Sequence, residues 1–189
     1  MKHCNKNVMK ILIVGNGGVG KSSLLHRIVK NKFCADMDIT IGIDFLVYEA
    51  DYNGQHYLLQ LWDFSGQERF RFILDSYVAG SSGVMLLFDL TRPETIDEID
   101  EWVQIARKTD RNIPILLVGT KNDRHVETNL NEDLIEYKMK EFALFDFVKT
   151  SAKTGNKAED GLMLLFKKIL ALRNANSEDG ENLQVLMQM

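Results

Sequence analysis

Residues 15–23 read GNGGVGKSS, which fits the pattern G-x-x-x-x-G-K-[S/T] at Gly15, Gly20, Lys21 and Ser22. The apolar run Val8–Val14 precedes this stretch and the amphipathic run Gly20–Lys30 follows it, which predicts a loop between a buried strand and a helix. Glycines let the backbone turn tightly enough for successive N–H groups to converge on phosphate oxygens at a helix N-terminus. The stretch therefore predicts a nucleotide phosphate site, against the alternative of a glycine-rich turn that binds nothing.

Individual residues of this loop have separate expected tasks. Lys21 is expected to reach the β and γ phosphates, and the Ser22 hydroxyl is expected to bind Mg²⁺. The other phosphate-binding candidates are Gly15, Gly17, Gly18, Val19, Gly20 and Ser23.

Outward from the loop, apolar runs alternate with amphipathic ones. Further strands are expected at Ile41–Ala50, Gln55–Asp63, Gly83–Leu90, Ile113–Gly119 and Phe145–Val148. Helices are expected at Glu94–Lys108, Asn131–Phe142 and Ala158–Leu172. Asn53-Gly54 predicts a tight hairpin between the second and third strands. This order predicts a doubly wound, mostly parallel α/β sheet with one antiparallel edge.

Length and composition indicate one domain and exclude several functions. The chain has 189 residues, and we expect a domain over residues 8–173 with flexible termini at 1–7 and 174–189. A net charge of −4 argues against nucleic-acid binding, and no apolar run is long enough to span a membrane. Two cysteines are too few for a disulfide framework, so a cytoplasmic location is expected. Lys2 and the ending LMQM predict no lipid anchor.

The choice of base depends on two later loops, TKND at residues 120–123 and TSAKTG at residues 150–155. Both follow strands, so they are expected on the same rim as the phosphate loop. The Asp123 carboxylate can accept hydrogen bonds from guanine N1–H and the 2-amino group, which adenine does not offer. Lys121 can lie across the base, and the Ala152 N–H can donate to guanine O6. These features favour GTP over the ATP of a P-loop kinase or ATPase.

Two other segments are expected to sense the third phosphate. Asp63 stands at the end of an expected strand, the usual position of a carboxylate that holds Mg²⁺ through a bound water. The Thr40 hydroxyl can complete the coordination shell of that ion. The Gly66 N–H can approach the γ-phosphate, and the Gln67 amide can orient the attacking water; a solvated residue at a helix start is the alternative for Gln67. Lys21, Gly66 and Gln67 are thus the catalytic candidates.

Five motifs in this order, GNGGVGKSS, ITIGIDF, WDFSGQERFR, TKND and TSAK, resemble the Ras superfamily of small GTPases, and IGIDF and GQERFRFI are most similar to its Rab branch. The resemblance covers residues 9–172 and implies a P-loop NTPase-type small G domain with a six-stranded sheet and about five helices. It further implies that Phe33 stacks on guanine, with Thr120, Ser151 and Lys153 completing that site. The implied effector surface comprises Ile41, Ile43, Phe45, Trp62 and Tyr77, with core packing as the alternative for the three aromatic residues.

Several positions depart from the family pattern. Thr120 stands in place of Asn, Met37 in place of an aromatic residue, and Phe64-Ser65 in place of Thr-Ala, which predicts a bulky ring beside the γ-phosphate. The chain lacks C-terminal prenylation cysteines, so either it was trimmed or it is an unlipidated relative.

The resemblance implies a monomeric switch that hydrolyses GTP slowly. Exchange factors, GTPase-activating proteins and effectors are expected to bind at Asn31–Phe45 and Phe64–Tyr77. No arginine lies between Asn31 and Thr40 to act in cis, whereas Arg69 and Arg71 are expected to fix the second loop or to meet partners. The alternative is a nucleotide-binding scaffold with negligible turnover.

Overall fold

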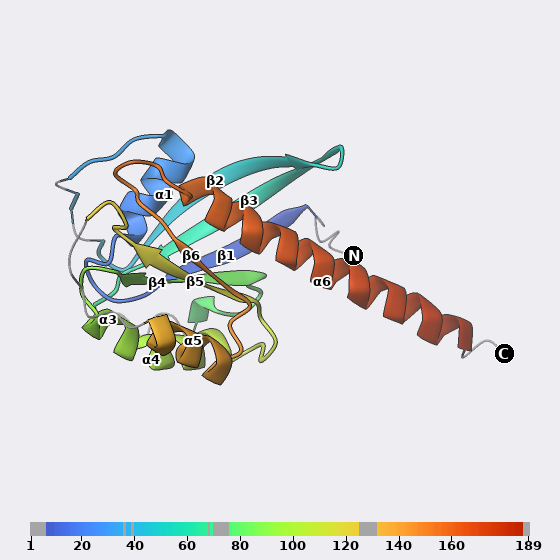
Figure 1. Ribbon diagram of the computed structural model, residues 1–189. Coiled ribbons are helices and arrows are strands. Elements are labelled where there is room, and N and C mark those ends of the chain that lie inside the picture. Colours follow the sequence, from blue (N-terminus) through green and yellow to red (C-terminus); the bar gives the residue numbers. More distant parts are fainter. Residues whose placement is uncertain are drawn as a thin grey trace.

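One six-stranded sheet forms the centre of the protein (Figure 1). The computed structural model describes residues 7–35, 37–38, 40–67, 69, 76–124 and 132–186, with side chains as far as residue 175. The strands are β1 (Val8–Val14), β2 (Ile43–Tyr52), β3 (Gln55–Phe64), β4 (Gly83–Asp89), β5 (Ile115–Thr120) and β6 (Asp146–Lys149). Their order in the sheet is β2-β3-β1-β4-β5-β6.

Only the β2–β3 pair of this sheet is antiparallel; β3–β1, β1–β4, β4–β5 and β5–β6 are parallel. The expected fold, a mostly parallel six-stranded sheet with one antiparallel edge strand, is confirmed. Asn53, with φ of 50°, and Gly54, with φ of 75°, form the two-residue turn between β2 and β3.

Helices cover both faces of the sheet (Figure 1). Those in the described part of the chain are α1 (Lys21–Lys30), α3 (Glu94–Asp97), α4 (Ile99–Ala106), α5 (Glu132–Glu141) and α6 (Ala158–Leu186). Helices α1 and α6 lie on one face, and α3, α4 and α5 lie on the other. Parallel strands connected by helices are covered in this way on both sides.

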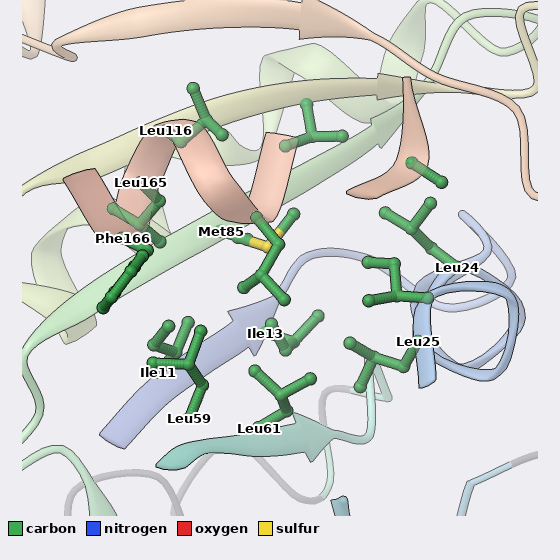
Figure 2. Close-up of a cluster of buried hydrophobic side chains, with 14 of the residues drawn as sticks. Ile11, Ile13, Leu24, Leu25, Leu59, Leu61, Met85, Leu116, Leu165 and Phe166 are labelled. Atoms are coloured by element: carbon green, nitrogen blue, oxygen red, sulfur yellow. The ribbon is translucent and has the colours of Figure 1, made fainter. Parts of the chain in front are cut away.

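Alternate residues of the central strands supply two separate hydrophobic cores. From β1, Ile11 and Ile13 point toward α1 and α6, where they join Leu25 and Phe166 (Figure 2). Leu12 of the same strand points to the other face, where its cluster includes residues of α4 and α5. This period of two, with both faces buried, explains why β1 reads as a continuous apolar run.

Two helices differ from the sequence-based expectation. The single helix expected at residues 94–108 is divided at Glu98, whose φ of −89° and ψ of 2° lie off the helical values. At the C-terminus, α6 continues to Leu186 and projects beyond the sheet, whereas we expected helix only to about Leu172 and a disordered tail after it. The tail contains no proline, so nothing in its backbone chemistry forces α6 to stop near Leu172.

Candidate functional site

A cavity of about 420 Å³ lies where the carboxyl ends of β1, β3 and β5 meet the loops that follow them. This is the rim at which ligands bind in open α/β sheets. Most of the predicted site residues line it: Gly17, Gly18, Gly20, Lys21, Ser22, Ser23, Phe33, Thr40, Gly66, Gln67, Thr120, Lys121, Asp123, Ala152 and Lys153. The cavity is also lined by Leu24, Cys34, Ala35, Asp38 and Arg124, which the sequence analysis did not single out.

Four predicted site residues lie behind the cavity wall rather than on it. Val19 packs in the core, fully buried, and Asp63 lies beneath the Ser22 and Thr40 hydroxyls. Ser151 is buried behind Asp123. Gly15 begins the phosphate loop with φ of 134°, and a Cβ there would lie 2.1 Å from the Leu87 carbonyl oxygen. Only glycine allows the loop to leave β1 this close to β4.

Side chains hold the first carbonyl groups of the phosphate loop. The Lys21 ammonium donates to the Gly15 and Asn16 carbonyl oxygens at 2.8 and 2.9 Å. Burial lowers the pKa of Lys21 to about 8; the Asp63 carboxylate opposes this effect and the Arg92 guanidinium adds to it. The Asn16 side chain accepts a hydrogen bond from the indole N–H of buried Trp102 at 2.8 Å. A poorly solvated positive charge therefore lies at the cavity wall, where it favours an anion.

The next three carbonyl groups are held from outside the loop. Arg92 Nη2 donates to Gly17 O at 3.1 Å, and Lys121 Nζ donates to Gly18 O at 2.9 Å. The Thr120 hydroxyl lies 2.5 Å from Val19 O and 2.9 Å from the Phe88 carbonyl oxygen. Every carbonyl from Gly15 to Val19 thus has a side-chain donor.

Replacing Thr120 with Val is expected to loosen the phosphate loop. Valine keeps the shape but removes the hydroxyl, so the buried Val19 carbonyl loses its side-chain donor. The free energy of unfolding should fall by about 1–3 kcal/mol, the usual cost of an unmet buried polar group. Urea denaturation measures this change, with Thr109→Val at an exposed position after α4 as the control. Equal stability of the Thr120→Val variant and the unaltered protein would show that the hydroxyl does not hold the loop.

Three oxygen-bearing side chains from separate segments meet beside the phosphate loop. The Ser22 and Thr40 hydroxyls lie 2.8 Å apart, Ser22 also hydrogen-bonds Asp63 Oδ2, and Thr40 Oγ1 lies 3.5 Å from that oxygen. Burial raises the pKa of the Asp63 carboxyl to about 6, although the Ser22 bond and the Lys21 charge act in the opposite direction.

The second oxygen of this carboxylate, Asp63 Oδ1, is buried and has no hydrogen-bond partner in the described part of the chain. A buried carboxylate oxygen without a partner is costly, and hydroxyl and carboxylate oxygens are the ligands that Mg²⁺ prefers. Ser22, Thr40 and Asp63 therefore fit a Mg²⁺ site, with Asp63 acting directly or through water.

The two loops that the sequence predicts to contact the base, TKND and TSAKTG, are tied to each other and to α1. The Ser151 hydroxyl donates to Asp123 Oδ1 at 2.5 Å, which fixes that carboxylate at the cavity. Arg27 Nε donates to the Ala152 carbonyl at 2.7 Å and Arg27 Nη2 to the Lys153 carbonyl at 3.0 Å. Because the Ala152 and Lys153 carbonyls point to Arg27, this loop has a fixed orientation beside the phosphate loop's helix.

The segment after β3 lies directly on the phosphate loop. A Cβ on Gly66 would lie 2.3 Å from the Asn16 carbonyl carbon and 2.4 Å from Gly17 N, so no other residue fits there. Gln67 lines the cavity, and its side-chain carbonyl accepts a hydrogen bond from Arg69 Nε at 2.8 Å. This bond stays within the second loop, so the expectation that Arg69 fixes the loop or meets partners stays a prediction, and Arg71 lies outside the described residues.

The prediction that the Phe64 ring lies beside the γ-phosphate is wrong. Phe64 is 1% exposed, packs in the core beneath α4, and does not line the cavity. Phe64 is the last residue of β3, and its side chain lies on the sheet face that α3, α4 and α5 cover. Its ring contacts that of Tyr77 at a centroid distance of 6.3 Å. Ser65 and Met37 do line the cavity.

An exposed aromatic surface adjoins this site. The Trp62 ring lies 5.3 Å from that of Phe45 and 5.6 Å from that of Tyr77, centroid to centroid. Ile41 is 75% exposed, and Phe45 and Tyr77 are also exposed. Ile43 and Trp62 are half-buried and pack against the core below α4, so Trp62 has both surface and core contacts.

The sequence analysis missed four polar or aromatic supports of the site: Arg27, Asp89, Arg92 and Trp102. Burial alone would raise the pKa of the Asp89 carboxyl, but hydrogen bonds from Lys121, Thr91 and Arg92 lower it below its usual value. The sequence did carry one signal for Asp89, a charged residue at the end of the apolar run GVMLLFD. A buried carboxylate at a strand's carboxyl end calls for cations nearby.

Within the described residues, no helix is long and apolar enough to cross a membrane. The same residues contain no cluster of three His, Cys, Asp or Glu side chains placed to hold a metal ion. His3, Cys4 and His125 lie outside the described part of the chain.

Known proteins resemble this chain over most of its length. A model of the Ras family matches residues 10–171. Ras-related protein Rab-4A of Rattus norvegicus is 36% identical over 93% of this chain and 81% of its own length. Ras-related protein SEC4 of Saccharomyces cerevisiae is 38% identical over 86% of this chain and 75% of its own length. Ras-related protein RABA2a of Arabidopsis thaliana is 32% identical over 94% and 88%, respectively.

Proposed function

The chain belongs to the Ras family, as a Rab-like small GTPase, and from this premise we propose that it is a switch that binds GTP and GDP with Mg²⁺ and hydrolyses GTP slowly. The observation that carries the proposal is one cavity that brings together the phosphate loop, the Ser151-held Asp123 carboxylate and the hydroxyls of Ser22 and Thr40. Asp123 and Ala152 read guanine, and Phe33 and Lys121 contact its faces.

Hydrolysis in this proposal is an in-line attack of water on the γ-phosphorus, which breaks the bond to the oxygen that bridges the β and γ phosphates. Gln67 orients the water, and the Gly66 N–H holds a γ-phosphate oxygen. Lys21 and the phosphate loop N–H groups stabilise the charge that develops on the β–γ oxygens. Mg²⁺, when bound by Ser22, Thr40 and Asp63, supplies further positive charge to the same oxygens.

Partner binding belongs to the same proposal. The segments Asn31–Phe45 and Phe64–Tyr77 border the cavity in their described parts and lead into the aromatic surface. We propose that effectors bind this surface in the GTP state, and that exchange factors and GTPase-activating proteins contact the same segments. We also propose that the protein is monomeric and cytoplasmic.

Replacing Gln67 with Leu is expected to slow hydrolysis roughly tenfold or more, because the water then lacks its orienting amide. The measurement is single-turnover phosphate release from GTP-loaded protein with Mg²⁺. Gln104→Leu makes the same chemical change at an exposed position of α4 and should leave the rate unchanged.

One observation favours a second candidate, a scaffold that binds nucleotide with negligible turnover. The Gln67 side-chain carbonyl already accepts a hydrogen bond from Arg69, which leaves it one lone pair fewer for an attacking water. Intact GTP on both the unaltered protein and the Gln67→Leu variant would support the scaffold. A protein that retains neither GTP nor GDP would overturn both candidates.

A further inference from the structure

One buried carboxylate anchors two cations beside the phosphate loop. The side chain of Asp89, at the end of β4, is 0% exposed. Its Oδ2 accepts Arg92 Nε at 2.9 Å and Lys121 Nζ at 2.6 Å, while its Oδ1 accepts the Thr91 N–H at 2.9 Å and the Thr91 hydroxyl at 2.7 Å. Asp89 is therefore held firmly and fixes the positions of both cations.

Each of these cations also binds the phosphate loop. Arg92 uses a second nitrogen, Nη2, for the Gly17 carbonyl at 3.1 Å, and Lys121 binds the next carbonyl, that of Gly18, at 2.9 Å. Arg92 does not line the cavity, so its guanidinium approaches the loop from the outer side.

Peptide geometry relates the Arg92 contact on the outer side to the interior of the cavity. In a planar trans peptide the C=O of one residue and the N–H of the next point in opposite directions. With the Gly17 carbonyl turned outward to Arg92, the Gly18 N–H turns inward. A charged donor on a carbonyl also polarises its peptide, which strengthens that N–H as a donor.

We propose that Arg92, anchored by Asp89, is a positioning residue that aims the Gly18 N–H at the β-phosphate. The inference rests on the proposed function, since it requires a guanine nucleotide in the cavity. Phosphate loops of this pattern cradle the phosphates with backbone N–H groups. Arg92 thereby contributes to nucleotide affinity without touching the nucleotide.

The test compares GDP with GMP, which share the base and first phosphate and differ in the β-phosphate. Arg92→Ala is expected to weaken GDP binding roughly tenfold, the effect of one charge-assisted hydrogen bond, and to leave GMP binding unchanged. The ³¹P resonance of the β-phosphate in bound GDP should move as well. Arg111→Ala, an exposed arginine in the α4–β5 loop, is the matched control and should change neither quantity.

Arg92→Lys separates geometry from charge. Arg92 contacts its two acceptors with two different nitrogens, Nε and Nη2, whereas the lysine side chain has a single nitrogen. The Lys variant should retain the thermal stability of the unaltered protein but bind GDP as weakly as Arg92→Ala does. Full recovery of GDP affinity by lysine would overturn the positioning role and leave only an effect of charge.

The remaining outcomes distinguish this inference from the proposed function. Equal weakening of GDP and GMP by Arg92→Ala would indicate general loosening of the site and overturn the inference. Unchanged GDP affinity would do so too, while the proposed function stands. If the unaltered protein binds neither nucleotide, the proposed function itself fails and the inference fails with it.

Discussion

Replacing Asp123 with Asn is expected to weaken GDP binding by roughly 10²–10⁴-fold, because one carboxylate oxygen becomes an NH₂ group that opposes the guanine 2-amino group, and the remaining hydrogen bond loses its charge. The Ser151 hydroxyl holds Asp123 Oδ1 at 2.5 Å, so the side chain cannot swing away to relieve the mismatch. Xanthine carries an oxygen where guanine has its 2-amino group, and the Asn amide can donate to it. The variant should therefore prefer xanthosine diphosphate.

Competition between fluorescent GDP and unlabelled xanthosine diphosphate measures both affinities. Asp160→Asn, at an exposed position in the first turn of α6, is the control for the same chemical change. If Asp123→Asn binds GDP as tightly as the unaltered protein does, Asp123 does not read the base.

Replacing Gly66 with Ala is expected to lower the hydrolysis rate by about 10²–10³-fold, the usual cost of losing one preorganised backbone donor in a transition state. The new Cβ would lie 2.3–2.4 Å from Asn16 and Gly17 backbone atoms, which cannot yield as a flexible side chain does. The segment after β3 must then move off the phosphate loop, and the Gly66 N–H moves away from the γ-phosphate. GDP lacks that phosphate, so its affinity should change only a few-fold.

Single-turnover hydrolysis and GDP affinity, measured together, test this expectation. Gly161→Ala makes the same change in α6, where the nearest atom to the new Cβ is a Val148 side-chain carbon at 3.2 Å, and it should retain the hydrolysis rate. A Gly66→Ala protein that hydrolyses GTP normally would show that the close packing of Gly66 on the phosphate loop has no catalytic consequence.

The sequence predicts much of this fold because each face of the sheet is buried by alternate residues of long apolar strands. Prediction from the sequence fails where backbone dihedral angles, or contacts between residues far apart in the chain, determine the structure. Glu98 divides one helix through its own dihedral angles, which no periodicity reveals. Phe64 belongs to the polar motif WDFSGQERFR, yet the alternation of side chains along β3 places its ring in the core.

The phosphate, metal and base candidates are identifiable from short motifs because each motif carries its chemistry locally. Their supports are not, since each reaches the site from another element. Arg27 contacts carbonyls 125 and 126 residues away in sequence, and Arg92 contacts Gly17 across 75 residues. The residues that flank each arginine do not reveal its partner, because the arginine and the carbonyl group come together only in the folded sheet.

The antiparallel hairpin has a mechanical consequence. Ile43, at the start of β2, pairs with Phe64, at the end of β3, and the Ser65 N–H continues the ladder to the Gly42 carbonyl at 2.8 Å. This bond joins the two segments where they leave the sheet: Thr40 lies two residues before Gly42, and Gly66 lies one residue after Ser65. A protein that displaces one segment therefore displaces the other, so binding to the Thr40 segment alone also moves Gly66 away from the phosphate loop.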